Sequence, residues 1–370
     1  MPPAEPKLRL AIVGTGDVAY RHYLPALADL AGDVAITAFV DPRSGAAEGA
    51  AASVAGWSPG ATPYTDLDVM LADGVAEAAI DLAPAPRHGA INAAILEAGL
   101  HLYSEKPLAG TVAEADALIA TAAGRGVSFL CAPGVAVSAR FRWIAELIAS
   151  GRYGHPTLAV THHADPGPAA WREYTGDPTP FYREGVGPVF DHGVYRLHAL
   201  TMLLGPVARV QAMGAIATPA RRVRGGPLAG QRIEVTTPDH VLINLQFANG
   251  ALGQLLASFG TPSTLAPWLE LHFPMATLSF SGAGYDAADP VSLYVDDDSA
   301  LAREGWQHGI DVPADDVAVV EAGVRHFIGC LRGETEPVLT AEHARHVLEI
   351  TLAAYESIAD GRSHAVESTF

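Results

Sequence analysis

Lysine and cysteine are both scarce in this chain of 370 residues. Of its 23 basic residues only Lys7 and Lys106 are lysines, which leaves 21 arginines. The two cysteines, Cys131 and Cys330, are too few for a disulfide framework and suit a reducing compartment, so we expect a cytoplasmic protein. No apolar run is long enough to span a membrane, and the N-terminal stretch lacks the basic start and apolar core of a secretory signal.

Positive charge is scarce overall. Asp and Glu number 41, and the formal net charge is -18. A surface this acidic repels phosphate backbones and anionic lipid headgroups, so we expect neither a nucleic acid nor a membrane as partner. The hydrophobic fraction of 49% supports a sizeable core, and the length predicts two domains.

The first third of the chain alternates between short apolar runs and alanine-rich stretches with helical spacing. The apolar runs cover residues 8–13, 34–40, 78–82, 100–103 and 127–131, and the helical stretches cover residues 18–30, 46–54, 88–97 and 112–123. Strands and helices that alternate in this way indicate an α/β domain, a doubly wound parallel sheet with helices on both faces. We expect this Rossmann-type domain to occupy residues 1–132.

The pattern changes after Gly154, where strand-like runs replace most of the helical ones. These runs cover residues 157–161, 207–217, 240–247, 251–259, 268–273 and 277–281, and helices are expected only over 189–204, 315–331 and 341–359. Asn249-Gly250 between two runs predicts a hairpin with a type I′ turn. We therefore expect an α/β domain with an open, mostly antiparallel sheet over residues 133–370, with the helix at 138–150 assignable to either domain.

A glycine-rich turn follows the first strand. Gly14-Thr15-Gly16-Asp17-Val18-Ala19 fits G-x-G-x-x-A, in which the glycines allow a tight turn and close approach of a pyrophosphate to the backbone. Asp41 ends the second strand, where a carboxylate binds the hydroxyls of an adenosine ribose and repels a 2′-phosphate. Arg43 is able to accommodate that phosphate, so we expect NAD with NADP as the alternative.

Two more segments follow strands at the same edge of the sheet. After the run at 78–82, Ala83 to His88 include two prolines, which either stiffen a ligand loop or start a helix. After the run at 100–103 comes Glu105-Lys106-Pro107. In a chain that otherwise uses Arg, Lys106 indicates a need for an ammonium, which is compact and able to hold a hydroxyl. The alternative is a surface lysine at the end of a strand.

A second constellation lies on the helix expected over 189–204. At α-helical spacing Asp191, Tyr195 and His198 share one face, which is a costly arrangement inside a core and a natural one along a cleft. The alternative is that Asp191 caps the helix and that the other two are half-buried surface groups.

Together, the glycine fingerprint, Glu105-Lys106-Pro107 and the Asp191-x-Gly193-x-Tyr195 helix resemble the Gfo/Idh/MocA oxidoreductases over essentially the whole chain. The resemblance implies an N-terminal Rossmann domain, a C-terminal domain for substrate binding and oligomerisation, and hydride transfer between NAD(P) and a secondary alcohol or carbonyl of a sugar, cyclitol or related polyol. Many members carry Asp-x-Gly-x-His-x-x-Asp, with the His as base. Here Tyr195 replaces that His, as in the glucose–fructose oxidoreductase and dihydrodiol dehydrogenase branch, and His198 replaces the last Asp.

The resemblance and the strand-end positions give two sets of candidate residues. The catalytic candidates are Lys106, Tyr195, Asp191 and His198, with either Tyr195 or His198 as the acid/base. The cofactor-binding candidates are Gly14, Thr15, Gly16, Asp17, Val18, Asp41, Arg43, Ala83, Pro84, His88, Glu105 and Lys106. Tyrosine has a reference pKa of about 10, and a nearby ammonium lowers it, which would give Lys106 a second role.

Several expectations concern what else the protein binds. His162 and His163 are adjacent on a strand and point to opposite faces, so they cannot share a metal, and we expect no metal site. Residues 165–187, rich in aromatic side chains, either cover a sugar ring or form an oligomer contact. An open sheet face favours a homodimer or homotetramer. Two other functions stay open: a redox-neutral enzyme with tightly bound NAD, acting in glycoside cleavage or epimerisation, and a non-catalytic NAD-binding regulator.

Overall fold

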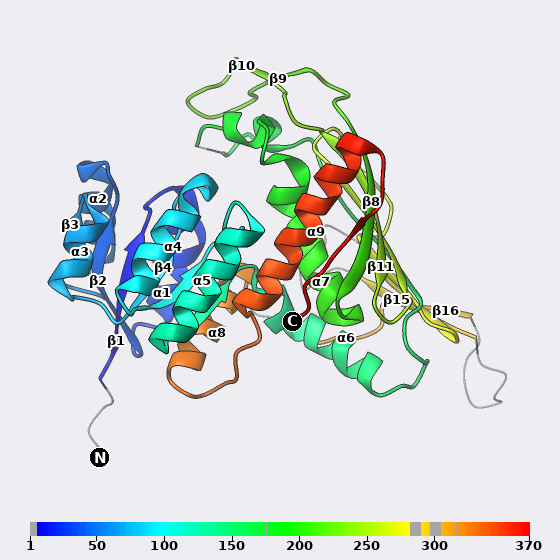
Figure 1. Ribbon diagram of the computed structural model, residues 1–370, viewed down its shortest axis with the longest axis horizontal. Coiled ribbons are helices and arrows are strands. Elements are labelled where there is room, and N and C mark those ends of the chain that lie inside the picture. The colour runs from blue at the N-terminus through cyan, green and yellow to red at the C-terminus, as the bar shows by residue number, and fades with distance from the viewer. Residues whose placement is uncertain (1–5, 175, 282–289, 297–304, 315–316) are drawn as a thin grey trace. The chain divides into compact units, whose positions relative to one another are not determined.

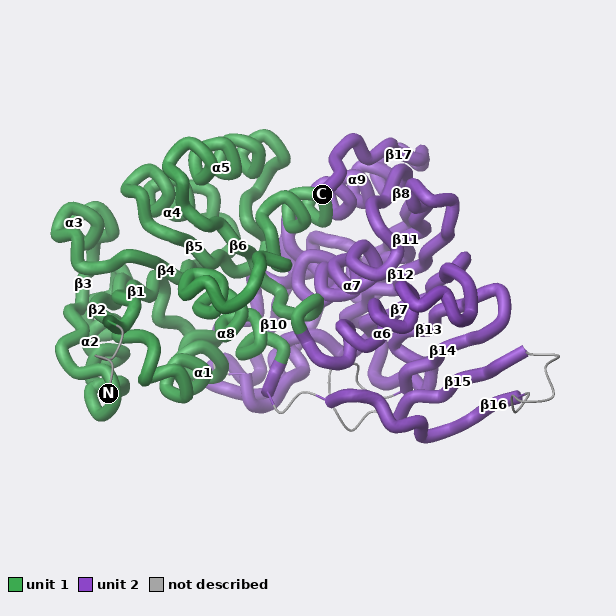
Figure 2. The backbone as a smooth tube through the Cα atoms, turned by 90° about the horizontal axis from the view of Figure 1, so that it is seen from below, with its two compact units in different colours: residues 1–137, 319–348 green, residues 138–318, 349–370 purple. Residues whose placement is uncertain are grey.

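The computed structural model describes residues 6–174, 176–281, 290–296, 305–314 and 317–370. The chain forms two compact units (Figure 2). Unit 1 comprises residues 1–137 and 319–348, and unit 2 comprises residues 138–318 and 349–370.

Unit 1 contains, among its described residues, one parallel sheet of six strands in the order β3-β2-β1-β4-β5-β6. Its strands are β1 (Leu8–Val13), β2 (Val34–Val40), β3 (Thr62–Tyr64), β4 (Ala78–Asp81), β5 (His101–Ser104) and β6 (Phe129–Cys131). This order is that of a dinucleotide-binding doubly wound fold, and it confirms the predicted fold class. Only β3 was not predicted, because it has three residues, one of them a proline.

The helices of unit 1 begin and end at sequence signals. They are α1 (Leu24–Asp29), α2 (Ser44–Val54), α3 (Leu67–Asp73), α4 (His88–Glu97), α5 (Val112–Arg125), α8 (Val319–Leu331) and the first part of α9 (Ala341–Asp360). For example, α5 begins with a capping box, in which Thr111 accepts from the backbone N–H of Glu114 and Glu114 accepts from that of Thr111. It ends at Gly126, whose φ of 68° suits glycine.

The return of residues 319–348 to unit 1 differs from the predicted domain of residues 133–370. Helix α8 contacts α1 and the short helical segments Ala19–Tyr23 and Gly134–Val137. Its Phe327 is fully buried, with its ring centroid 5.6 Å from that of Tyr103. Sequence reasoning predicted a helix here but had no signal for what that helix would contact. The helix begins at Val319, and residues 315 and 316 of the helix predicted over 315–331 lie outside the described residues.

Unit 2 contains, over the residues described, a sheet of nine strands in the order β16-β15-β14-β13-β7-β12-β11-β8-β17. The strands are β7 (Leu158–Ala164), β8 (Val207–Ala215), β11 (His240–Phe247), β12 (Leu252–Ser258), β13 (Leu269–His272), β14 (Ala276–Phe280), β15 (Val291–Val295), β16 (Gly305–His308) and β17 (His364–Ala365). Among these described strands only β7 and β12 pair in parallel, so the sheet is mostly antiparallel, as predicted. A small hairpin of β9 (Ala220–Arg222) and β10 (Arg232–Glu234) accompanies it.

One face of this sheet carries the helices of unit 2 (Figure 1). They are α6 (Ala139–Ala149), α7 (Val194–Leu204) and the rest of α9. Helix α7 contacts β7 and β12, and Ser357 of α9 accepts a hydrogen bond from the backbone N–H of Ala212 in β8. Helix α6, which sequence reasoning left unassigned, belongs to unit 2. Among the described residues, no helix is both long enough and apolar enough to cross a membrane.

The hairpin between β11 and β12 is present, but its turn differs from the predicted type I′. Gly250 has a φ of 90°, whereas Asn249 does not adopt a positive φ. The side chain of Asn249 instead donates to the carbonyl of Leu204 and accepts from the backbone N–H of Ala251. A longer loop with a single left-handed glycine therefore replaces the two-residue turn.

Candidate active site

The glycine loop after β1 lies against the end of β4. Gly14 has a φ of 90°, and a Cβ added there would lie 2.7 Å from the backbone N of Ala83, so the fold itself requires glycine. A Cβ added at Gly16 would meet no atom within 4 Å. The protein therefore leaves open space beside Gly16, and this suits the close approach of a dinucleotide pyrophosphate.

Two further fingerprint residues follow the loop. Asp17 and Val18, both partly buried, precede a π-helical turn over Ala19–Tyr23. The carboxylate of Asp17 lies 2.9 Å from Nε of Arg21.

Asp41 at the end of β2 is buried, and its carboxylate already has protein partners. Oδ2 accepts hydrogen bonds from the backbone N and Oγ1 of Thr15 at 3.1 and 2.9 Å, and Arg43 donates to both oxygens. Burial raises the pKa of Asp41, but the hydrogen bonds from Arg43 and Thr15 outweigh it and hold this pKa well below its usual range. Because the Arg43 side chain is 70% exposed, it is able to move aside for a ribose.

His88 spans the two loops that follow β4 and β5. Its Nδ1 lies 2.6 Å from the carbonyl oxygen of Pro107 and its Nε2 lies 2.7 Å from that of Ala83. Each ring nitrogen thus lies at hydrogen-bond distance from the carbonyl oxygen of one loop. His88 is 1% exposed and links the two loops, whereas the adjacent Pro84 is exposed.

The charge of His88 acts on Asp81, the last residue of β4. Burial raises the pKa of Asp81 to about 6, and His88 opposes that rise. Oδ1 of Asp81 accepts from the backbone N–H of Ala83, while its Oδ2 is buried without a hydrogen-bond partner. Asp81 was not among the predicted site residues, because in the sequence it lies within a predicted apolar strand.

Glu105 fixes the backbone of Lys106 through a hydrogen bond. Its Oε1 accepts a 2.7 Å hydrogen bond from the hydroxyl of buried Tyr23, and its Oε2 accepts from the backbone N–H of Lys106. Lys106 is partly exposed at the carboxyl edge of the sheet and is followed by a cis peptide bond to Pro107. The hydrogen bond to Glu105 thus fixes the backbone of Lys106 at the edge where ligands bind in such sheets.

In unit 2 the second predicted constellation begins with a π-helical turn, η6 (Val189–Gly193), which α7 continues. The α-helical spacing used to place Asp191, Tyr195 and His198 on one face therefore does not hold at Asp191, since a π-turn has an i→i+5 pattern. Asp191 is 8% exposed, Tyr195 is partly exposed and His198 is 4% exposed.

His192, which sequence reasoning did not single out, lies at the centre of this region. Its Nδ1 is 3.5 Å from Oδ2 of Asp191, and its ring centroid is 6.2 Å from that of Tyr195. The rings of His163 and Trp171 lie 4.0 and 5.4 Å from it. In the sequence, His192 could have been singled out because it stands between Asp191 and Gly193 of the motif. A regular α-helix, however, would direct its side chain away from the face shared by Asp191 and Tyr195.

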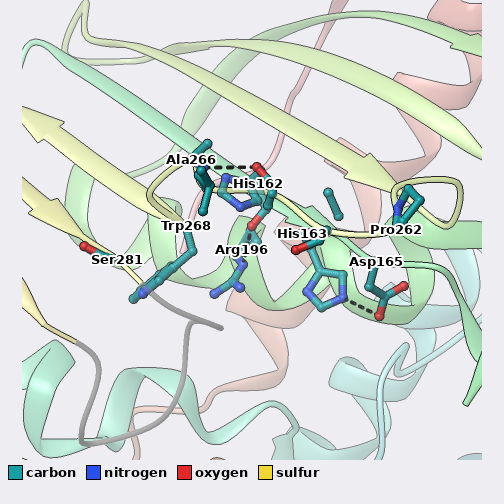
Figure 3. Close-up of a pocket in the computed structure, with 12 residues that line it drawn as sticks. His162, His163, Asp165, Arg196, Pro262, Ala266, Trp268 and Ser281 are labelled. Atoms are coloured by element: carbon teal, nitrogen blue, oxygen red, sulfur yellow. Dashed lines mark hydrogen bonds and ion pairs between the residues drawn. The ribbon is translucent and has the colours of Figure 1, made fainter.

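A pocket of about 540 Å³ opens beside these residues within unit 2 (Figure 3). His162, His163, Asp165, Arg196 and Trp268 help to line it. The guanidinium of buried Arg196 stacks 4.5 Å from the ring of Trp268 and donates to the carbonyl of His162. Burial, with the charges of Arg196 and His163, lowers the pKa of His162 to about 4, so this ring is neutral at pH 7.

Ala169 and Tyr182 anchor the segment that follows β7 in a small apolar cluster with residues of other segments. Tyr182 is fully buried with Phe259 and Ile233, and its hydroxyl accepts from the backbone N–H of Ala169. This packing places Trp171 beside His192.

Comparison with known proteins decides the family. Residues 8–132 match the model of an oxidoreductase family with an NAD-binding Rossmann fold, and residues 141–279 match the Gfo/Idh/MocA C-terminal domain. The chain belongs to the Gfo/Idh/MocA oxidoreductase family. It is thus an enzyme of an NAD-binding family whose named members act on hydroxyl or keto groups of sugars and cyclitols.

Two relatives and one solved structure illustrate the likeness. The dTDP-3,4-didehydro-2,6-dideoxy-alpha-D-glucose 3-reductase of Streptomyces antibioticus is 28% identical over 281 residues, which cover 72% of this chain and 81% of that one. The scyllo-inositol 2-dehydrogenase (NAD(+)) of Bacillus subtilis is 23% identical and covers 96% of both chains. A structure of levoglucosan dehydrogenase in complex with NADH matches with a TM-score of 0.80 at 18% identity, covering 98% of this chain and 100% of that one, and shows the shared fold.

Proposed function

We propose that this Gfo/Idh/MocA oxidoreductase transfers a hydride between NAD and a secondary alcohol or carbonyl carbon of a sugar, cyclitol or related polyol. The observation that carries the proposal is the placement of Lys106. Its backbone is fixed by Glu105, which accepts a hydrogen bond from Tyr23 in turn, and the residue is partly exposed at the carboxyl edge of the Rossmann sheet. Bound NAD supplies the carbon that accepts or gives the hydride.

Three side chains would handle the substrate hydroxyl and its proton. Lys106 would orient the hydroxyl and favour the phenolate form of Tyr195. Tyr195 would take the hydroxyl proton, or return it in the reverse direction. We prefer Tyr195 to His198 because His198 is 4% exposed, whereas Tyr195 is partly exposed beside His192. Asp191 would accept from a second substrate hydroxyl or hold Lys106.

The proposed cofactor contacts follow the carboxyl edge of the sheet. Gly14 and Gly16 would carry the pyrophosphate, with Thr15, Asp17 and Val18 alongside. Asp41 would take the ribose hydroxyls after Arg43 moves aside, and this favours NAD over NADP. Ala83, Pro84 and Lys106 would line the nicotinamide end. His88 and Glu105, both buried in contacts with their own chain, act as positioning residues.

A ring-shaped polyol suits the aromatic surroundings of His192. Trp171 offers an apolar face close to His192, in the turn that carries Asp191, and sugars combine apolar CH faces with hydroxyl groups. We therefore favour, for residues 165–187, the interpretation in which they cover a sugar ring.

The open face of the unit 2 sheet supports a homo-oligomer, either a dimer or a tetramer. Met213, Leu242, Leu252 and Leu158 are exposed on the adjacent strands β8, β11, β12 and β7, and Leu242 pairs directly with Met213. Exposed apolar side chains on neighbouring strands are typical of a face that a partner covers. We propose that the protein is located in the cytoplasm, since Cys131 and Cys330 are both free thiols.

The test is a panel of sugars and cyclitols assayed by nicotinamide absorbance, with NAD or NADP for the alcohols and with NADH or NADPH for the keto forms. It includes scyllo-inositol, levoglucosan and their keto forms. Net NADH from at least one alcohol, with NADP weaker, supports the proposal. Bound NAD that never yields net NADH while a glycoside is cleaved or epimerised would favour the redox-neutral alternative.

A further inference from the structure

Three side chains of the type that bind metal ions converge in unit 2, where β7 ends and η6 begins. His163 lies in β7, Asp165 follows that strand and His192 lies in η6. Each offers one ligand atom, and these atoms all lie within 4.8 Å of one another. The three are partly buried, with side chains 15%, 25% and 24% exposed, so an ion is able to reach them.

The spacing fits a shared ion better than a direct hydrogen bond. Nε2 of His163 lies 3.4 Å from Oδ2 of Asp165, which is longer than a good N–H···O bond (Figure 3). Ligands held about 2.0–2.1 Å from a tetrahedral Zn²⁺ lie about 3.4 Å from each other. Two of the three ligands therefore already have the separation that a bound ion requires.

The surroundings supply the charge that a cation needs. Oδ2 of Asp191 lies 3.5 Å from Nδ1 of His192, so a carboxylate stands at one nitrogen of this imidazole. A metal-binding histidine commonly has a carboxylate at its other nitrogen. Here the 3.5 Å separation is that of an ion pair and is longer than a hydrogen bond. With neutral imidazoles, Asp165 and Asp191 together carry two negative charges.

The expectation of no metal rested on the opposite orientations of His162 and His163 and on the lack of any Cys/His spacing typical of a zinc site. His162 is not a member of the cluster. What the sequence did not reveal is that His163 and Asp165, two residues apart along an extended chain and so on one side of it, meet His192 from a distant turn.

We propose that His163, Asp165 and His192 bind one divalent transition-metal ion, preferentially Zn²⁺. Imidazole and carboxylate ligands suit this ion, and three protein ligands leave a fourth position for a water molecule or a substrate oxygen. His163 and Asp165 also line the 540 Å³ pocket, which gives that fourth position access to a ligand. The proposal rests on unit 2 alone and stands or falls independently of hydride transfer.

The experiment uses the full chain without a histidine tag. The protein is stripped with EDTA, loaded with Zn²⁺ and desalted, and its metal content is measured. A second sample is titrated with Co²⁺ and its visible spectrum is recorded. We expect one equivalent of Zn²⁺, and a Co²⁺ absorption of the intensity typical of four-coordinate geometry.

Matched variants locate the site. His192→Asn and Asp165→Asn each remove one ligand and are expected to weaken Zn²⁺ binding about 100-fold or more, since loss of an outer partner alone costs 10–100-fold. His162→Asn, on the same strand but outside the cluster, is expected to bind like the wild type.

Two results would overturn the proposal. One is wild-type protein that retains no stoichiometric Zn²⁺ and shows no ligand-field absorption with Co²⁺. The other is Zn²⁺ binding that survives unchanged in folded His192→Asn and Asp165→Asn. If either variant fails to fold, His163→Asn, which removes the third ligand, takes its place, and unchanged Zn²⁺ binding in it would equally overturn the proposal.

Discussion

At the scale of single residues, the chemistry is expected to depend on Lys106. Lys106→Met keeps the length of the side chain but removes the ammonium, and turnover should fall about 100-fold or more. NAD affinity should change little, because the glycine loop is untouched. Steady-state kinetics and NAD titration check this, with Lys7→Met, the other lysine and an exposed one, as the matched control. Equal losses in both variants would contradict a specific role for Lys106.

The choice of acid/base is a second question at this scale. Tyr195→Phe removes only the phenolic oxygen, and turnover should fall about 100-fold or more with NAD binding kept. His198→Gln should mainly lower thermal stability, because His198 is almost fully buried. Kinetics and melting curves of the two variants distinguish the roles. Wild-type turnover in Tyr195→Phe, together with inactive but folded His198→Gln, would reverse the assignment.

Asp81 should make folding stability depend on pH. Its pKa is raised by burial from 3.8 to about 6, so between these values the folded protein keeps a proton that the unfolded chain has lost. Its stabilising contribution is present below pH 4 and is lost as the pH rises through 6. Asp81→Asn keeps the acceptor for Ala83 and removes the charge, so relative to wild type it should gain at most about 3 kcal/mol between pH 4 and 7.5. Urea unfolding across this range measures the gain, and a relative loss would contradict the account.

Residues that follow predicted strands could be found from the sequence, because the carboxyl edge of a parallel sheet collects them. This is how Asp41, Lys106 and the glycine loop were found. Asp81 and His192 were missed, because burial in one case and a π-turn in the other determine what the side chain contacts. No local sequence pattern shows the burial of Asp81 or the π-turn at His192.

At the scale of elements, two substitutions in the glycine loop distinguish a role in folding from a role in cofactor binding. In Gly14→Ala the added Cβ meets backbone atoms at 2.7 Å and φ is 90°, so unfolding should become easier by about 1–3 kcal/mol. In Gly16→Ala the Cβ meets nothing within 4 Å, so stability should be kept while NAD affinity falls about tenfold or more. Thermal unfolding and NAD titration of both variants check this. Unchanged NAD affinity in Gly16→Ala would refute the placement of the pyrophosphate.

Most elements were predictable because each has a local signal. The strand over residues 240–247 and the helical segment over 189–204 were predicted with the bounds that the structure gives. The type of helix at 189–193 and the type of turn at Asn249 were not, since both depend on tertiary contacts such as the bond from Asn249 to Leu204.

At the scale of the whole molecule, the exposed sheet face predicts self-association. Leu242→Glu places a charge beside Met213 on the exposed face, and an oligomer that buries this face would then have to desolvate that charge. We expect a wild-type dimer or tetramer and a variant of lower mass by light scattering. Val69→Glu, which changes an exposed apolar side chain of α3 in unit 1, is the control. A monomeric wild type would contradict this expectation.

The fold class and the family motifs followed from the sequence, but the division of the chain did not. Residues 319–348 return to unit 1 after almost two hundred residues, and the amphipathic pattern of α8 does not say which surface it covers. The proposed metal site was missed for the same reason. Its ligands come from the end of β7 and from η6, about thirty residues later, and no local pattern shows that these two segments meet.

The central claim is that hydride passes between a carbinol carbon and nicotinamide. Its most direct test uses an alcohol from the panel that is deuterated at the reacting carbon, incubated with the enzyme and NAD, followed by mass spectrometry of the cofactor. The account predicts reduced cofactor that carries one deuterium, and much less of it with Lys106→Met. Reduced cofactor without deuterium, or none from any alcohol with NAD or NADP, would contradict it.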